Sequence, residues 1–278
     1  LVYADDTLLV DVSVETVDLF MRCISEIGQQ YGLSFNWAKL EAMPVNMEAQ
    51  FEKPEDKYDK PGDKYIDNRS VLKYLGCHIS RDGRVGSELG RKLGQAKRDF
   101  ENLAKVWAHS YISMHRKVSI FEACVGSKLL YGLTSACLLK ADRQRLDGFH
   151  ARCLRRILKI PAAYVSRVSN ASVFQRASAR PLSIQLLRQQ LCFLGDLAMR
   201  PSDDPVRSCV FQPNGCSLVN RTVQRKRGRP ATSWATSVYP LAIEAAGGTH
   251  EKLSELFTLG AKAKRTWRTA VTLYCKRL

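Results

Sequence analysis

The chain has 278 residues, 45% of them hydrophobic, and a formal net charge of +16. It contains no signal peptide and no apolar run of transmembrane length, and its nine cysteines are scattered singly, without zinc-ligand spacing. These features argue against a membrane-spanning, secreted or zinc-binding protein. We therefore expect an intracellular protein of the cytoplasm, the nucleus or both, with reduced cysteines.

The charge is unevenly distributed along the chain. Residues 1–83 have a net charge of −6, residues 84–192 of +14 and residues 193–278 of +8. An N-terminal part rich in carboxylates, followed by a basic body, is typical of a metal site joined to a surface that binds a polyanion. The alternative is a soluble basic protein with no such partner.

The first ten residues predict a β-hairpin with two carboxylates at its tip. Apolar and β-branched residues at positions 1–3 and 7–10 favour strands, and Ala4-Asp5-Asp6 is the turn between them. Mg²⁺ prefers oxygen ligands and is commonly held by one or two carboxylates together with substrate phosphates. Asp5 and Asp6 are therefore candidate metal ligands for phosphoryl transfer, or else simply a favourable turn pair.

Residues 14–31 predict an amphipathic helix capped by Ser13, with one apolar face that we expect to be buried. That face consists of Val17, Phe20, Ile24, Ile27 and Tyr31. The features expected next are a strand at 33–36, a turn that carries Lys39, a strand at 40–45, and an exposed loop or weak hairpin over 46–68. Residues 71–80 then predict a strand that runs into a hairpin turn at Asp82-Gly83.

Three amphipathic helices with basic outer faces are predicted at 87–107, 114–131 and 142–158. Because three consecutive helices share this pattern, we expect them to grip a nucleic-acid duplex by its phosphates. The basic residues expected to do so are Arg91, Lys92, Lys97, Arg98, Arg152, Arg155 and Arg156. The alternative is that these charges are only solvated faces.

The remaining chain predicts helices at 183–198, 251–257 and 261–274. Between them lies a basic turn that runs into Trp234, and its glycine and proline disfavour a helix. Its basic residues are Arg225, Lys226, Arg227 and Arg229. They predict an extended arm that contacts a phosphate backbone, a minor-groove hook or a nuclear localisation patch.

Several of these segments resemble motifs of the reverse transcriptases of non-LTR (LINE-type) retrotransposons, in the same order along the chain. Tyr3-Ala4-Asp5-Asp6 resembles motif C, and Gly32-Leu33 with Asn36 and Lys39 resembles motif D. Lys73-Tyr74-Leu75-Gly76 resembles motif E, the primer grip, and the three basic helices resemble the thumb.

The resemblance implies roles for these residues. Asp5 would be a catalytic ligand of Mg²⁺ or Mn²⁺, with Asp6 beside it in a supporting role. Lys39 would lie near the phosphates of the incoming nucleotide, where a cation favours departure of pyrophosphate. Tyr74, Leu75 and Gly76 would hold the end of the primer.

We therefore expect an α+β fold with small antiparallel palm-like hairpins and a helix in residues 1–84. A mostly α-helical thumb-like bundle would follow in 85–162, and a basic helical or irregular extension in 163–278. The partners would be an RNA template, a DNA primer and, in the complete enzyme, deoxynucleoside triphosphates, with no membrane.

The sequence opens in mid-strand and includes neither the motif A aspartate nor the fingers, so we expect a fragment that does not polymerise DNA alone. The alternatives are a non-catalytic nucleic-acid-binding module and a decayed retroelement remnant.

Overall fold

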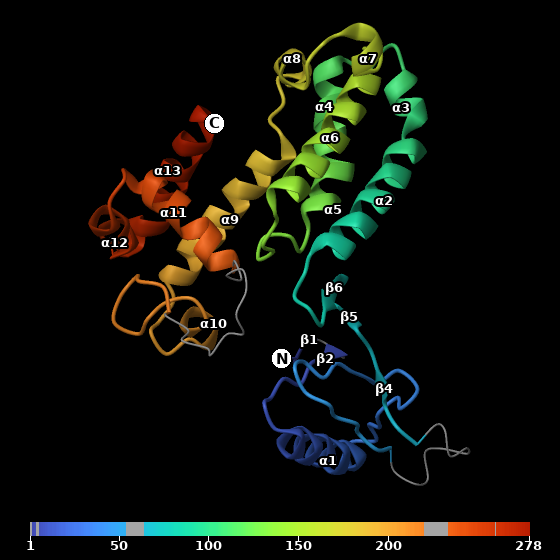
Figure 1. Ribbon diagram of the computed structural model, residues 1–278, viewed down its shortest axis with the longest axis vertical. Coiled ribbons are helices and arrows are strands. Elements are labelled where there is room, and N and C mark those ends of the chain that lie inside the picture. Colours follow the sequence, from blue (N-terminus) through green and yellow to red (C-terminus); the bar gives the residue numbers. More distant parts are fainter. Residues whose placement is uncertain (1, 4–5, 54–63, 220–232, 259) are drawn as a thin grey trace. The chain divides into compact units, whose positions relative to one another are not determined.

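Figure 1 shows the computed structural model, which describes residues 2–3, 6–53, 64–219, 233–258 and 260–278. The predicted α+β class is confirmed in its coarse form, because the chain is mainly helical with a few short strands. It divides into two compact units, Leu1–Glu88 and Leu89–Leu278. The finer division into three functional domains stays a prediction. Among the described residues, no helix combines the length and apolar character needed to cross a bilayer.

The N-terminal unit holds the described strands, which pair two by two. The pairs are β1 (Val2–Tyr3) with β2 (Asp6–Thr7), antiparallel; β3 (Glu41–Ala42) with β4 (Asp67–Asn68), parallel; and β5 (Val71–Tyr74) with β6 (Cys77–Ser80), antiparallel. The predicted strand at 33–36 is absent, because this segment has no ladder partner and leads into a turn closed by Lys39 N–H donating to Asn36 O (2.9 Å).

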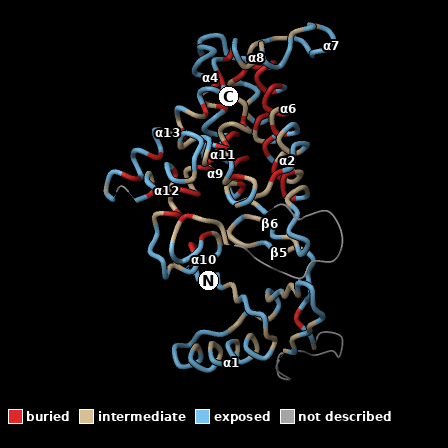
Figure 2. Tube along the Cα trace, turned by 60° about the vertical axis from the view of Figure 1, so that its left-hand side comes forward, coloured by how far each residue is buried: buried red, intermediate tan, exposed pale blue. Residues whose placement is uncertain are grey.

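Helix α1 (Val14–Gln30) forms where predicted, and the hydroxyl of Ser13 caps it by accepting from Thr16 N–H (3.1 Å). The expectation that its apolar face is buried is wrong for this unit. Phe20 is 55% exposed, Ile27 58% and Tyr31 77%. Within the described part of this unit, Ile66 is the single buried hydrophobic residue, so the unit has almost no core for the helix to pack on. Figure 2 shows α1 without a buried segment.

The β5–β6 hairpin turns earlier than predicted, at Leu75-Gly76. Both residues have positive φ, 46° and 78°, which is the combination that a two-residue type I′ turn requires. Asp82 forms a separate turn, in which its carboxylate accepts from Ser80 Oγ (2.8 Å) and Arg84 N–H (2.9 Å). These hydrogen bonds, with that to Arg84 contributing most, lower the pKa of Asp82.

The second unit is helical. Its first half consists of α2 (Gly86–Asn102), α3 (Ala104–Ala108), α4 (Met114–Phe121), the π-helical turn η3 (Glu122–Gly126), α5 (Ser127–Leu130), α6 (Lys140–Ile157), α7 (Ala163–Ser166) and α8 (Asn170–Ala177). The predicted apolar stripes are confirmed as its core, since Leu89, Phe100, Phe121, Leu146 and Ile157 are all at most 4% exposed.

Where α2 ends, after Asn102, two polar side chains donate hydrogen bonds to backbone carbonyls. Trp107 stacks on Phe100 with ring centroids 5.0 Å apart, and its indole N–H donates to Phe100 O (2.7 Å). The ammonium of Lys117, only 3% exposed, donates to Trp107 O (2.8 Å). A buried lysine therefore holds the C-terminal end of α3 against α4.

The helix predicted over 114–131 contains the π-helical turn η3. In an uninterrupted α-helix, at about 100° per residue, Leu130 would point about 180° away from Phe121. Both residues are nevertheless buried, at 3% and 0% exposure. The wider turn absorbs one extra residue and brings Leu129 and Leu130 back to the core.

The second half of this unit is built around α9 (Leu182–Ala198). It also contains α10 (Pro205–Ser208), α11 (Trp234–Ala246), α12 (His250–Thr258), the 3₁₀ turn η4 (Gly260–Lys262) and α13 (Ala263–Arg277). The predicted helices at 183–198, 251–257 and 261–274 are confirmed, and α8 and α11 were not predicted. α13 packs so closely on α9 that the indole N–H of Trp267 donates to Leu191 O (2.9 Å).

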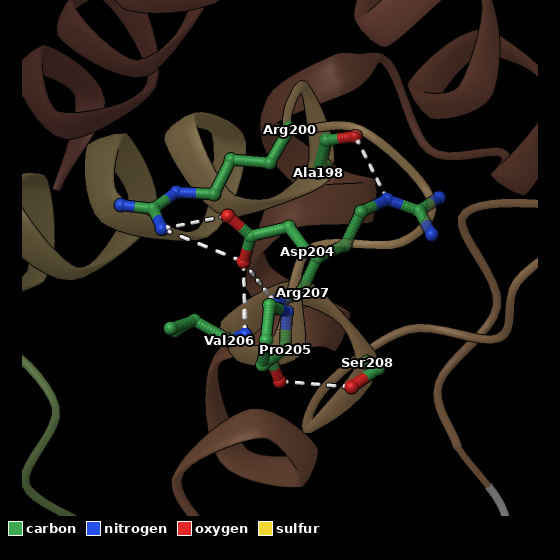
Figure 3. Close-up of polar contacts among 7 residues, drawn as sticks. All are labelled: Ala198, Arg200, Asp204, Pro205, Val206, Arg207 and Ser208. Atoms are coloured by element: carbon green, nitrogen blue, oxygen red, sulfur yellow. Dashed lines mark hydrogen bonds and ion pairs between the residues drawn. The ribbon is translucent and has the colours of Figure 1, made fainter. Parts of the chain in front are cut away.

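The corner after α9 is held by three charged side chains (Figure 3). Asp204 caps α10 by accepting from Val206 N–H (2.8 Å) and Arg207 N–H (3.0 Å), and it pairs with Arg200 (3.2 Å). The Arg207 hydrogen bond is the main cause that lowers the pKa of Asp204. The buried guanidinium of Arg207 donates to the carbonyls of Ala198, Gln212 and Gly215.

Candidate functional site

The two predicted metal ligands fall at the β1–β2 hairpin. Asp6 lies in β2 opposite Tyr3, not in the turn, and is exposed, whereas Asp5 lies outside the described residues. Over the part of the chain that the structure describes, no three side chains of His, Cys, Asp or Glu gather as a metal-binding group. Of the two predicted ligands, the structure therefore places Asp6, a single exposed carboxylate.

The other residues assigned by resemblance lie in turns of the same unit. Lys39 is exposed at the end of its turn. Tyr74 is the last residue of β5, and Leu75 and Gly76 form the tip of the β5–β6 hairpin. The three predicted primer-grip residues are therefore contiguous at one tip, where backbone groups and a half-buried ring are presented together.

The predicted basic face of α6 forms a continuous stripe. We call Arg145, Arg152, Arg156 and Lys159 the basic stripe. At about 100° per residue Arg145, Arg152 and Arg156 fall within about 40° of one another around the helix. Lys159 follows just beyond the C-terminal end of α6, with a left-handed φ of 56°, and all four residues are exposed. From Arg145 to Arg156 the stripe extends about 16 Å at 1.5 Å per residue. Arg145 pairs with Asp142 (3.5 Å).

Helix α2 borders the basic stripe and runs in the same direction as α6 (Figure 1). Near one end, a Cβ added at Gly90 would lie 3.6 Å from the guanidinium of Arg145. Near the other end, the guanidinium of Arg156 lies 5.9 Å from the ring centroid of Phe100. Lys97, two turns beyond Gly90, shares that side of α2 and is exposed. Lys97 of α2 therefore lies beside the basic stripe and adds a fifth cation to this surface.

Two of the predicted phosphate-binding residues point inward instead. Lys92 is 6% exposed, and its ammonium lies 5.3 Å from the ring centroid of Tyr131. Arg155 is also 6% exposed, and its guanidinium donates to Val168 O (2.6 Å) and Asn170 Oδ1 (3.1 Å). Both cations hold the helical unit together and are not available to a partner.

The remaining predicted contacts are separated from the stripe. Arg91 is half-buried and Arg98 is exposed. Their helical positions are about 120° and about 100° from that of Lys97, so they face away from the α2–α6 seam. Arg225, Lys226, Arg227 and Arg229 lie outside the described residues. Arg145 and Lys159, which were not among the predicted contacts, complete the stripe. Arg145 precedes Arg152 by seven residues, or two helical turns, and this spacing is the signal that identifies it.

The deeply buried titratable groups lie in the helical core. His150 is 0% exposed and stacks on Phe121 with ring centroids 5.0 Å apart, and neither ring nitrogen has a hydrogen-bond partner among the described residues. Burial lowers the pKa of His150 to about 4. Burial likewise raises the pKa of Cys153 to about 12, so this thiol stays protonated and unreactive at neutral pH.

The fold and the site define a mainly helical α+β protein with a basic stripe on a packed helical unit. No family model, curated protein or solved structure matches the chain.

Proposed function

We propose that the chain is part of the RNA-directed DNA polymerase of a non-LTR retroelement, in which the helical unit binds the primer–template duplex by its phosphates. The palm-like role of the hairpins, the thumb-like role of the helices and the Mg²⁺ dependence all belong to this proposal. They rest on the order of the sequence motifs.

The basic stripe is the observation that supports the binding function. Its three arginines lie along one face of α6, which is anchored in the core by Leu146, Phe149 and Ile157, and Lys159 lies just beyond the end of that helix. A linear array of this kind matches the linear charge of a nucleic-acid backbone, and phosphate contacts fix position without reading sequence. The proposed binding is therefore independent of base sequence and strongly dependent on salt.

A non-catalytic nucleic-acid-binding module is the second candidate. It is favoured by the difference in packing between the two units, because the basic stripe belongs to the unit that holds nearly all of the described buried core. Under either candidate we expect the purified chain not to extend a primer. Primer extension that disappears in Asp5→Ala would contradict that expectation and favour the polymerase outright.

The first prediction concerns the stripe itself. We expect Arg152→Gln/Arg156→Gln to weaken binding of a labelled 20-base-pair RNA–DNA duplex. The slope of log K against log salt should become shallower by about 2, because each lost phosphate contact removes about 0.9 from it. Fluorescence anisotropy between 50 and 200 mM salt measures both quantities.

The matched control removes two exposed arginines elsewhere in the unit, Arg116→Gln/Arg176→Gln. It changes net charge by the same amount and should leave the slope nearly unchanged. An equal loss in both double variants would show that net charge alone drives binding, and the stripe would then have no specific role.

A further inference from the structure

A second basic surface lies along α13. A shallow groove of about 560 Å³ follows this helix, and four cations line it, Lys264, Arg265, Arg268 and Lys276. At 1.5 Å per residue the groove extends about 18 Å from the first of these to the last. None of the four is among the residues that the sequence predicts to contact phosphates.

The groove exists because short side chains alternate with long ones on the same helix face. Thr269 and Thr272 lie between the four cations, and their hydroxyls donate back to the carbonyls of Arg265 (3.0 Å) and Arg268 (2.7 Å). These hydrogen bonds hold the threonines against the helix. The arginine and lysine side chains therefore extend beyond the short threonines on this side of the helix.

The charge of this groove is strongly one-sided. No carboxylate is among the lining residues that the structure describes. At its edge, Asp196 of α9 pairs with Lys264 (2.9 Å) and Arg268 (3.6 Å). One carboxylate against four cations leaves a net charge of +3 along about 18 Å of helix.

The form of the groove selects among anionic partners. It is open and elongated, whereas small anions are usually enclosed by convergent donors. Of the described residues that line it, Leu273 is the one apolar side chain, and a membrane-surface helix needs a broad apolar face. A phosphodiester backbone, which is linear and densely charged, fits these features best.

We propose that the α13 groove is a second binding surface for the phosphate backbone of a nucleic acid, distinct from the basic stripe on α6. This inference rests on the proposed function, because it adds a second contact to the same polyanion. It holds that α13 touches the nucleic acid directly and does not serve only to close the core through Trp267.

Lysine footprinting on the full chain tests the groove and the stripe separately. The chain is acetylated with and without the 20-base-pair RNA–DNA duplex, and mass spectrometry follows the rate at each lysine. We expect several-fold slower acetylation of Lys276 in the groove, and of Lys97 and Lys159 at the stripe. Lys140, exposed on another face of α6, should be unaffected.

The pattern of protected lysines separates the proposal for the α13 groove from the proposal for the basic stripe. Protection of Lys97 and Lys159 without Lys276 overturns the α13 groove and leaves the stripe intact. Protection of Lys276 alone does the reverse, and protection of none overturns both. If poly-glutamate protects Lys276 and the duplex does not, the groove binds an acidic protein segment and the inference is wrong.

A charge-removing variant gives a second readout. We expect Arg265→Gln/Lys276→Gln to reduce duplex affinity and the salt slope, whereas Arg116→Gln/Arg176→Gln should not. Both pairs are exposed, so neither substitution disturbs the core. Unchanged binding by the α13 double variant would overturn the inference.

Discussion

At Gly195 the absence of a side chain allows α9 and α13 to meet. A Cβ at this position would lie 2.2 Å from both Cδ1 and Nε1 of the Trp267 indole, a distance at which the two helices must separate. The same indole donates to Leu191 O and is 1% exposed. This contact therefore fixes the distance between the two longest helices of the C-terminal half.

We expect Gly195→Ala to lower the free energy of unfolding of the helical unit by about 1–3 kcal/mol, as overpacking does. The penalty should exceed the gain of up to about 1 kcal/mol that alanine brings to a helix interior. Urea unfolding followed by far-UV circular dichroism measures the change. Gly94→Ala is the control, because Gly94 is exposed in α2 with nothing within 4 Å of an added Cβ, and it should stabilise.

His150 predicts a pH dependence of stability. Its pKa is about 4 in the folded chain and about 6.5 when unfolded, so the unfolded state binds more protons between these values. The contribution of neutral His150 to the free energy of unfolding is therefore fully present above about pH 6.5 and is lost as the pH falls toward 4. The loss amounts to about 3 kcal/mol.

We expect His150→Phe to abolish this part of the acid sensitivity. The variant keeps an aromatic ring between Phe121 and Phe174 and removes two ring nitrogens that have no partner. Urea unfolding of both proteins at pH 7 and pH 4.5 should show a stability difference that widens at the lower pH. Parallel pH profiles for the two proteins would contradict the assignment, and His150→Leu repeats the test without a ring.

At the scale of single elements, the sequence predicts helices well where an apolar stripe meets a packed neighbour. The stripes of α2, α4 and α6 lie in the core as expected, because three-to-four-residue spacing leaves one arrangement that buries them. Helix α11 was missed because its sequence is apolar on most faces and contains Pro240. The spacing of apolar residues alone does not distinguish such a helix from a buried segment without regular secondary structure.

Spacing alone does not reveal which charged residues a later segment covers. Arg155 and Arg156 are adjacent and were given the same role, but the chain from Pro161 to Asn170 folds over Arg155 and supplies its hydrogen-bond acceptors. Lys92 is likewise covered from another part of the chain, by Tyr131. The stripe on α6 was predictable in outline, and its exact membership depended on tertiary contacts.

The β5–β6 hairpin shows a related limit. Asp82-Gly83 is the stronger turn signal, yet the chain turns at Leu75-Gly76, where leucine adopts a left-handed conformation that costs about 1–2 kcal/mol. Register explains the choice, because this turn pairs Leu72 with Ile79 on one face of the ladder. Cross-strand pairing of apolar side chains outweighs the local preference of one residue.

For the whole molecule, charge and packing divide the chain at nearly the same place. The acidic first 83 residues fall within the unit that has almost no buried core, and the basic remainder falls mostly within the well-packed helical unit. The sequence predicted the charge division directly. It could not predict the difference in packing, because the apolar face of α1 looks like a core face whether or not a partner layer covers it.

The π-helical turn η3 predicts how the chain responds to the deletion of a single codon. It accommodates one residue more than an uninterrupted α-helix would. With one residue removed, about 100° per residue would place Leu129 and Leu130 within about 80° of Phe121, on the side that they now share.

An in-frame loss of the codon for Cys124, which is exposed, should therefore convert the turn to regular helix and leave the chain folded. Loss of the codon for Cys192, in the unbroken α9, should rotate half of that helix out of the core and unfold the unit. Circular dichroism and expression of soluble protein distinguish the two deletions.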